Sequence, residues 1–225
     1  MKNRNYERSL PGGYRLVKKM DAADFGFGLI LTLGSLVLFV LCLGVLFLPL
    51  LFNIDRIGEF NPDLLVLVMA IYLVVTILYL VLHELTHGVA YKSMTGEKLT
   101  FGIKWNCAFC GVPNILTYRK TSLIALYAPF LLFTLIFVPA TIWAWFYSIE
   151  AYITASLILA THISGCIGDL YMGHLLLTKY RSPMTLLNDT GPCVRVFTFD
   201  ERNIGKTDNA TEIFKRNLEL KSNRK

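Results

Sequence analysis

The stretch Leu82–Gly88 reads Leu-His-Glu-Leu-Thr-His-Gly and contains the HExxH pattern. On a helix, His83 and His87 are four residues apart and project from one face, so both imidazoles can bind a single Zn²⁺. Glu84 lies beside them and is placed to take a proton from a zinc-bound water. The pattern therefore predicts a zinc site on a helix. The alternative interpretation is a pair of structural histidines at the water-accessible end of that helix.

A zinc site of this type needs a third protein ligand and an open position for water. Asp169 is the only acid within any of the long apolar runs of the chain. At 1.5 Å per helical residue, His83 lies roughly 29 Å and Asp169 roughly 26 Å from the outer ends of their runs, which is nearly the same depth. Gly165 and Gly168 permit close approach of the helix that carries Asp169. We expect Asp169 to complete the site; a carboxylate paired with a polar neighbour is the alternative.

Other polar residues are candidates for contacting a substrate. His162 lies seven residues before Asp169 and shares its helix face, so it binds substrate, stabilises an oxyanion or serves as a structural histidine. Asn106 and Asn114 lie in a loop between two β-prone pieces, where an amide can hydrogen-bond a substrate. Cys107-Ala-Phe-Cys110 is a lone CxxC without the second pair of a zinc ribbon, which favours packing over a functional thiol pair.

Four long apolar runs must position these residues. The runs are residues 25–54, 64–82, 121–149 and 151–178. Each meets the requirement of about 20 apolar residues for a helix that crosses a hydrocarbon layer about 30 Å thick. Their uniform apolarity excludes the alternating pattern of a membrane barrel. If all four runs cross the membrane, 21 of the 22 Lys and Arg residues lie on the same side of it as the two chain ends. Because Lys and Arg are enriched on the cytoplasmic side, this predicts that both chain ends are cytoplasmic.

The composition supports the same interpretation. Of the 225 residues, 54% are hydrophobic and 17% are charged, whereas soluble domains have about 45–50% and about 25%. This composition excludes a disordered chain and a disulfide scaffold. The net charge of +6 lies outside the apolar runs, so we expect a lipid bilayer and no nucleic acid as a partner.

We therefore expect an all-α polytopic membrane protein with four transmembrane helices. Residues 98–118 are expected to form a small β-hairpin or re-entrant loop on the cytoplasmic side, because β-prone pieces flank a turn that contains Gly111 and Pro113. The expected organisation is a cytoplasmic N-terminal tail over 1–24, a membrane core over 25–180 and a basic cytoplasmic C-terminal tail over 181–225.

The chain resembles intramembrane zinc metalloproteases of the site-2 protease type, and it is similar to a set of small four-span zincin membrane peptidases. The resemblance covers about residues 60 to 195 and is carried by these features: the His-Glu-Leu-Thr-His-Gly stretch, Phe101-Gly102, Tyr127-Ala-Pro-Phe130, Gly168-Asp169 and Asp189-Thr-Gly191. It implies that His83, His87 and Asp169 hold zinc and that Glu84 is the general base.

These observations predict an intramembrane or membrane-interface zinc metalloprotease with one Zn²⁺ per chain. Its expected substrate is a membrane protein or peptide, hydrolysed by water that Glu84 activates. Two alternatives stay open: a metal transporter in which the same ligands form a transit site, and a catalytically silent membrane scaffold. A transporter needs several polar groups along a pathway, and beyond His162 the outer part of the runs offers few.

Overall fold

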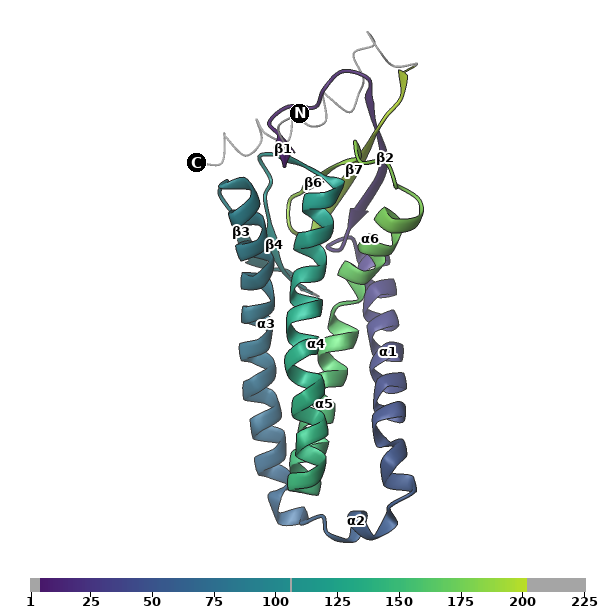
Figure 1. Ribbon diagram of the computed structural model, residues 1–225, viewed down its shortest axis with the longest axis vertical. Helices are drawn as coiled ribbons and strands as arrows, with labels where there is room; N and C mark the ends of the chain where they lie inside the picture. Colours follow the sequence, from purple (N-terminus) through teal and green to yellow (C-terminus); the bar gives the residue numbers. More distant parts are fainter. Residues whose placement is uncertain (1–4, 106, 202–225) are drawn as a thin grey trace.

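The computed structural model describes residues 5–105 and 107–201. In this part of the chain long helices run side by side, and antiparallel strands gather at one end of the bundle (Figure 1). The helices are α1 (Phe25–Leu51), α2 (Ile54–Gly58), α3 (Leu65–Thr95), α4 (Arg119–Tyr147), α5 (Ile149–Gly165) and α6 (Ile167–Thr178), with a 3₁₀ turn at Pro62–Leu64. The strands are β1 (Tyr6–Glu7), β2 (Tyr14–Asp21), β3 (Thr100–Ile103), β4 (Ala108–Gly111), β5 (Leu116–Tyr118), β6 (Leu186–Asp189) and β7 (Cys193–Phe199).

The apolar runs of the sequence form helices with defined ends. The Asp24 carboxylate caps α1 by accepting the N–H of Phe27, and α3 ends at Gly96, whose φ of 71° suits glycine. In the described residues three helices are long and apolar enough to cross a membrane, at Phe25–Leu51, Pro62–Thr95 and Arg119–Tyr147. The fourth run is a pair, α5 and α6, bent by 44° at Cys166.

The expectation of an all-α protein is wrong, because both polar end segments contribute strands. The five-stranded sheet has the order β1-β5-β6-β7-β2, and all of its neighbours are antiparallel. Strand β2 lies within residues 1–24, and β6 and β7 lie within 181–225. These strands bury one apolar face under α4 and α6 through a cluster of Met20, Leu126, Met172, Leu176, Tyr180, Leu187 and Val196. The average polarity of the two end segments does not indicate this apolar face, since only alternate residues of each strand contribute to it.

A hairpin within residues 98–118 is confirmed, although its second strand differs from the expected one. Strand β3 pairs with β4, and β5 pairs instead with β1 and β6. The hairpin lies directly on α3 at Gly88, where a Cβ atom would come within 2.8 Å of Phe101 Cζ and 3.4 Å of Cys110 Sγ. The helix surface just beyond His87 is therefore covered by β3 and β4.

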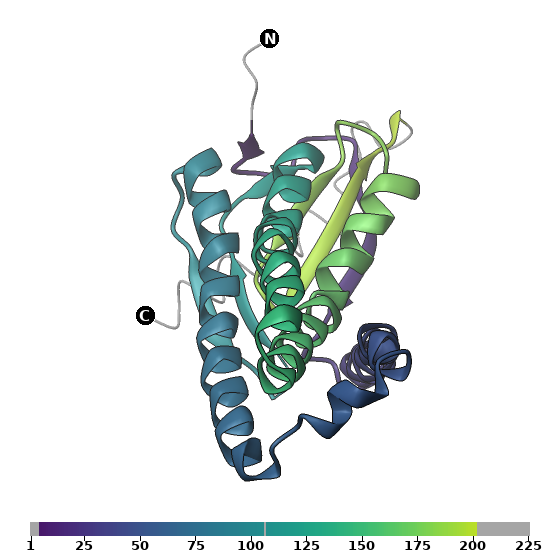
Figure 2. The same ribbon diagram turned by 60° about the horizontal axis from the view of Figure 1, so that its bottom comes forward.

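The long helices connect two distinct ends of the molecule. The strands and the start of α1 lie at one end, and α2 and the junction between α4 and α5 lie at the other (Figure 1). Seen from below, α6 lies over β7 and β2, and α1 stands beside α6 and α5 (Figure 2). The sheet therefore links the segment that precedes α1 to the segment that follows α6.

Gly111 tests the close packing between β4 and the turn after β6. A Cβ atom at Gly111 would overlap the backbone nitrogen of Gly191, and backbone cannot rotate away. We expect G111A to lower the free energy of unfolding by about 1–3 kcal/mol, as overpacking does, and to lower the thermal unfolding midpoint of the detergent-solubilised protein. The control is G44A, because a Cβ atom at Gly44 meets nothing within 4 Å. Equal midpoints for the two variants would contradict the close approach.

Candidate metal centre

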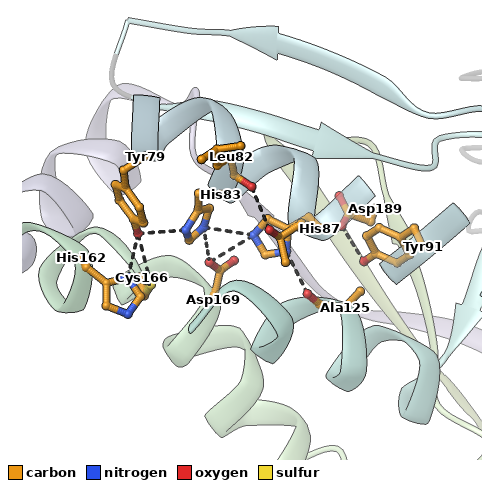
Figure 3. A network of polar contacts seen from close by, with 11 residues as sticks. Tyr79, Leu82, His83, His87, Tyr91, Ala125, His162, Cys166, Asp169 and Asp189 are labelled. Atoms are coloured by element: carbon orange, nitrogen blue, oxygen red, sulfur yellow. Dashed lines mark hydrogen bonds and ion pairs between the residues drawn. The ribbon is translucent and has the colours of Figure 1, made fainter. Parts of the chain in front are cut away.

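Three side chains from two helices converge on one point (Figure 3). The Nε2 atoms of His83 and His87, both on α3, are 3.2 Å apart, and Asp169 Oδ2 on α6 lies 3.3 Å from the first and 3.4 Å from the second. Two ligands bound about 2.0–2.1 Å from a tetrahedral zinc ion are separated by about 3.3 Å. The triangle therefore has the dimensions of three ligand positions around one ion, with the fourth position left for water or substrate.

The far side of the His87 ring supports the same interpretation. His87 Nδ1–H donates to the carbonyl oxygen of Ala125 on α4, at 2.8 Å. A neutral imidazole with its proton on Nδ1 presents a lone pair at Nε2. That lone pair faces the Asp169 carboxylate at 3.4 Å. Two acceptors at this distance repel each other unless a cation or a proton lies between them, so the donor set fits a divalent metal that takes nitrogen and oxygen ligands.

The bend in the last apolar run positions the carboxylate. Helix α5 ends at Gly165, and Asp169 lies in the first turn of α6. The Ser35 hydroxyl of α1 donates to the carbonyl oxygen of Ser164 at 3.0 Å, which satisfies an acceptor at the end of α5. The His83 and His87 residues are 7% exposed, and the Asp169 side chain is 21% exposed. The site is thus mostly withdrawn from solvent yet open on the side of the carboxylate.

A cavity of about 640 Å³ adjoins the three side chains. Its walls come from α1, α3, α5, α6 and β4, with further residues from β2, α4, β6 and β7. Glu84, the neighbour of His83, is half-buried and lines this cavity together with His83, His87 and Asp169. The arrangement therefore provides a carboxylate that is not part of the triangle but lines the same cavity.

His162 lies behind the triangle rather than in the cavity wall. Its ring is fully buried, with Nδ1 2.9 Å from the Tyr79 hydroxyl and Nε2 3.0 Å from Thr134 Oγ1. His83, His162 and Cys166 also form a group whose ligand atoms lie within 4.8 Å of one another. The Tyr79 hydroxyl contacts all three of these residues, so hydrogen bonding accounts for this second group.

The remaining sequence candidates lie at different places. Asn114 is exposed on the loop between β4 and β5 and does not line the cavity, and Asn106 lies outside the described residues. Cys107 and Cys110 of the CxxC pair both line the cavity, Cys110 from within β4. Burial raises the pKa of the Cys110 thiol to about 12, so it is a neutral thiol at physiological pH.

Three residues near the centre were not singled out from the sequence as site residues. Tyr79 and Tyr91 flank the histidines, each four residues away, so all four rings lie along one face of α3. The Tyr79 hydroxyl lies 2.9 Å from His83 Nδ1, and the Tyr91 hydroxyl donates to Asp189 Oδ2 at 2.8 Å. The spacing of four that drew attention to the histidines extends to both tyrosines and was the available signal.

Asp189 is a second carboxylate near the cavity. It lies at the end of β6, 7% exposed, and accepts the Tyr91 hydroxyl and the Gly191 N–H. Burial raises the pKa of Asp189 to about 6, because the charged form loses its hydration. The residue also lines the cavity, so its charge state contributes to the electrostatic field there.

The segment that contains this site matches a known protein family. Residues 76–182 match the sequence profile of a protein family described as "Putative zincin peptidase". The matched segment includes α3 from Thr76 onward and all of α6, and it therefore contains the whole triangle and Glu84. The comparisons with curated proteins and with solved structures found no match. The match supports a zincin-like family, and thus the class of metallopeptidases.

The raised pKa of Asp189 predicts a pH-dependent stability. Because the folded-state pKa of about 6 lies above the usual 3.8, the folded state binds the proton more tightly, and stability falls as the pH rises from about 4 to about 6. The expected loss is about 3 kcal/mol. In D189N this loss is absent, because the amide does not ionise and still bonds Tyr91.

Thermal unfolding midpoints of metal-free protein, measured between pH 4 and pH 7, test this expectation. The matched control is D63N at an exposed position, which should keep the wild-type pH dependence. A wild-type slope in D189N would show that another group dominates this range.

Proposed function

We propose that this chain is a membrane-embedded zinc metallopeptidase that cleaves peptide bonds within or next to the bilayer, as site-2 proteases do. The observation that carries the proposal is the triangle formed by His83, His87 and Asp169, with edges of 3.2 to 3.4 Å. Glu84 lies beside it in the same cavity. The match to a family of zincin peptidases supports the metallopeptidase class.

The outer surface of the helices supports insertion in a bilayer. Large apolar side chains on α3 and α4 face outward, with Val66 80%, Leu135 75% and Phe146 75% exposed. A helix that is apolar all round is stable when lipid or protein covers it. We propose four passes, with α5 and α6 as one broken span and both chain ends cytoplasmic. The distribution of Lys and Arg supports this orientation, and so does the location of the strands at one end (Figure 1).

In the proposed mechanism His83, His87 and Asp169 hold zinc. A bound zinc ion lowers the pKa of a water and polarises a carbonyl. Glu84 accepts a proton from the attacking water and then donates it to the leaving amine. The Ala125 carbonyl holds the His87 ring so that Nε2 faces inward. Ordered ring orientation matters because outer hydrogen bonds set the tautomer of a metal-binding histidine.

The cavity suits an apolar substrate segment. Leu31 and Phe39 of α1 and Leu80 of α3 contribute apolar side chains to its wall. A helical substrate in lipid has its backbone hydrogen bonds made internally. Its peptide bonds become accessible to Glu84 only after local unwinding, so the enzyme must stabilise an extended segment.

Strand β4 is placed to stabilise such a segment by β-strand addition. Residues 107–110 line the cavity, and β3 covers one edge of β4. The Lys104 N–H donates to the Cys107 carbonyl at 2.7 Å, and hydrogen-bonding direction alternates along a strand. Phe109 therefore bonds β3, while the backbone groups of Ala108 and Cys110 point toward the opposite edge.

Hydrogen exchange tests this role of β4. We expect an apolar peptide hydroxamate, which combines a zinc-binding group with an extended backbone, to slow exchange at the amides of Ala108 and Cys110. The amide of Phe109, already bonded to β3, is the internal control and should not change. Unchanged exchange at Ala108 and Cys110 with the hydroxamate bound would exclude strand addition at β4.

Substitution of Glu84 tests the proposed activity. Purified E84Q should retain one zinc per chain, because Glu84 is outside the triangle, and should cleave about 10²–10⁴-fold more slowly, because proton transfer is lost. The readout is the formation of new peptide N-termini, counted by mass spectrometry, when the purified protein is mixed with solubilised host membranes. The matched control is E97Q, since Glu97 lies beyond the end of α3 and pairs with Arg8.

H83A and D169A should lose both zinc and cleavage. Full zinc content in D169A would reassign the third ligand. Zinc flux that survives in E84Q would indicate a transporter, and a wild type that produces no new N-termini would indicate a silent scaffold.

A further inference from the structure

We propose that Tyr79 and His162 are positioning residues that hold His83 in the tautomer able to bind metal. This inference rests on the proposed function, because it concerns the metal that His83 would hold. Neither residue lines the triangle, and His162 contacts it only through Tyr79 (Figure 3). Tyr79 also lines the cavity, but its hydroxyl lies between His83 Nδ1 and His162 Nδ1, so the contact of both residues with the triangle is through the His83 ring.

The geometry is a continuous chain of hydrogen bonds that starts at His83. The Tyr79 hydroxyl lies 2.9 Å from His83 Nδ1 and 2.9 Å from His162 Nδ1. His162 Nε2 lies 3.0 Å from Thr134 Oγ1. This series of hydrogen bonds connects α3 to α5 and α5 to α4, so three helices determine where the His83 ring points.

Proton counting leaves two possible polarities for this chain. A hydroxyl has one hydrogen, so Tyr79 donates to one imidazole nitrogen and accepts from the other. In the first polarity His83 Nδ1–H donates to Tyr79, Tyr79 donates to His162 Nδ1, and His162 Nε2–H donates to Thr134. In the reverse polarity Tyr79 donates to His83 Nδ1, and a neutral His83 then carries its proton on Nε2. Only the first polarity leaves a lone pair at His83 Nε2 for a metal.

Tyr79 and His162 are buried, so the loss of either hydrogen bond leaves a polar group without a partner. His162 is 0% exposed and Tyr79 is 4% exposed. The Phe130 ring stacks on the His162 ring, with 5.8 Å between the ring centroids. Solvent has little access to these two side chains, and an unpaired buried N–H or O–H is costly. Cys166 Sγ is 3.9 Å from the Tyr79 hydroxyl and offers only a weak alternative. Loss of His162 therefore leaves Tyr79 with His83 Nδ1 as its remaining strong acceptor, which favours the reverse polarity.

Zinc affinity is the direct readout, measured by chelator competition on the detergent-solubilised protein. We expect Y79F and H162L each to weaken zinc binding about 10–100-fold, the range known for partners of metal-binding histidines. In the Y79F background, H162L should add less than about twofold, because His162 acts only through Tyr79. Additive losses, or single variants with wild-type affinity, would overturn the proposal.

Tyr72 supplies a matched control. Its hydroxyl lies 2.9 Å from Thr161 Oγ1 and thus bonds the same two helices, about two turns before Tyr79 on α3. Y72F removes one interhelical hydrogen bond without touching His83, so its zinc affinity should equal that of the wild type. A loss in Y72F as large as in Y79F would assign both effects to helix packing and would overturn the positioning role.

A second measurement needs no variant and therefore does not depend on whether the variants fold. It uses the NMR chemical shifts of the imidazole nitrogens in zinc-loaded wild-type protein, which report the tautomer of each histidine. The chain has four histidines, so ¹⁵N labelling gives few signals to assign. We expect His83 to carry its proton on Nδ1 and His162 to carry its proton on Nε2. A His162 proton on Nδ1 would overturn the relay while leaving the metal site intact. A wild type that binds no zinc would instead overturn the proposed function, so the two failures are distinguishable.

Discussion

The described structure depends most on the close approach of three electron-pair donors in a poorly hydrated place. Two imidazole nitrogens and a carboxylate oxygen lie within 3.4 Å of one another, between α3 and α6. Such a cluster is unfavourable unless a cation or protons neutralise it, and desolvation increases the cost. The surrounding residues must therefore hold the three groups against their own repulsion, and the hydrogen bonds behind the rings do so.

Each ring on the polar face of α3 has its partner on a different element. His87 bonds a carbonyl of α4, Tyr79 bonds His162 of α5, and Tyr91 bonds Asp189 of β6. This distribution couples the packing of the bundle to the geometry of the site, because a shift of any one element moves a ring. Such mutual support is what a preorganised metal site requires.

The sheet at one end of the bundle serves the same purpose at longer range. Strand β2 precedes α1, β7 follows α6, and the two strands pair over most of their length. The start of α1 is thereby held beside α6, where Phe27 contacts Tyr171, and residues of both helices form walls of the cavity. The hairpin of β3 and β4 closes another side against Gly88. Residues 107–110 of this hairpin line the cavity, so its wall includes strand backbone as well as helices.

Local patterns in the amino-acid sequence determined the helices and the two histidines of α3. Apolar runs of sufficient length form helices wherever they lie, and a spacing of four puts His83 and His87 on one face. Asp169 stood out because an acid is costly within an apolar run. Tertiary structure alone decided the bend at Cys166 that brings Asp169 within 3.4 Å of both histidines, and the bonds of Tyr79 to His162. It also decided the pairing of the end segments into a sheet, as Tyr14 with Phe199 shows. These features join residues far apart in the chain, so they depend on packing between elements, which local periodicity does not encode.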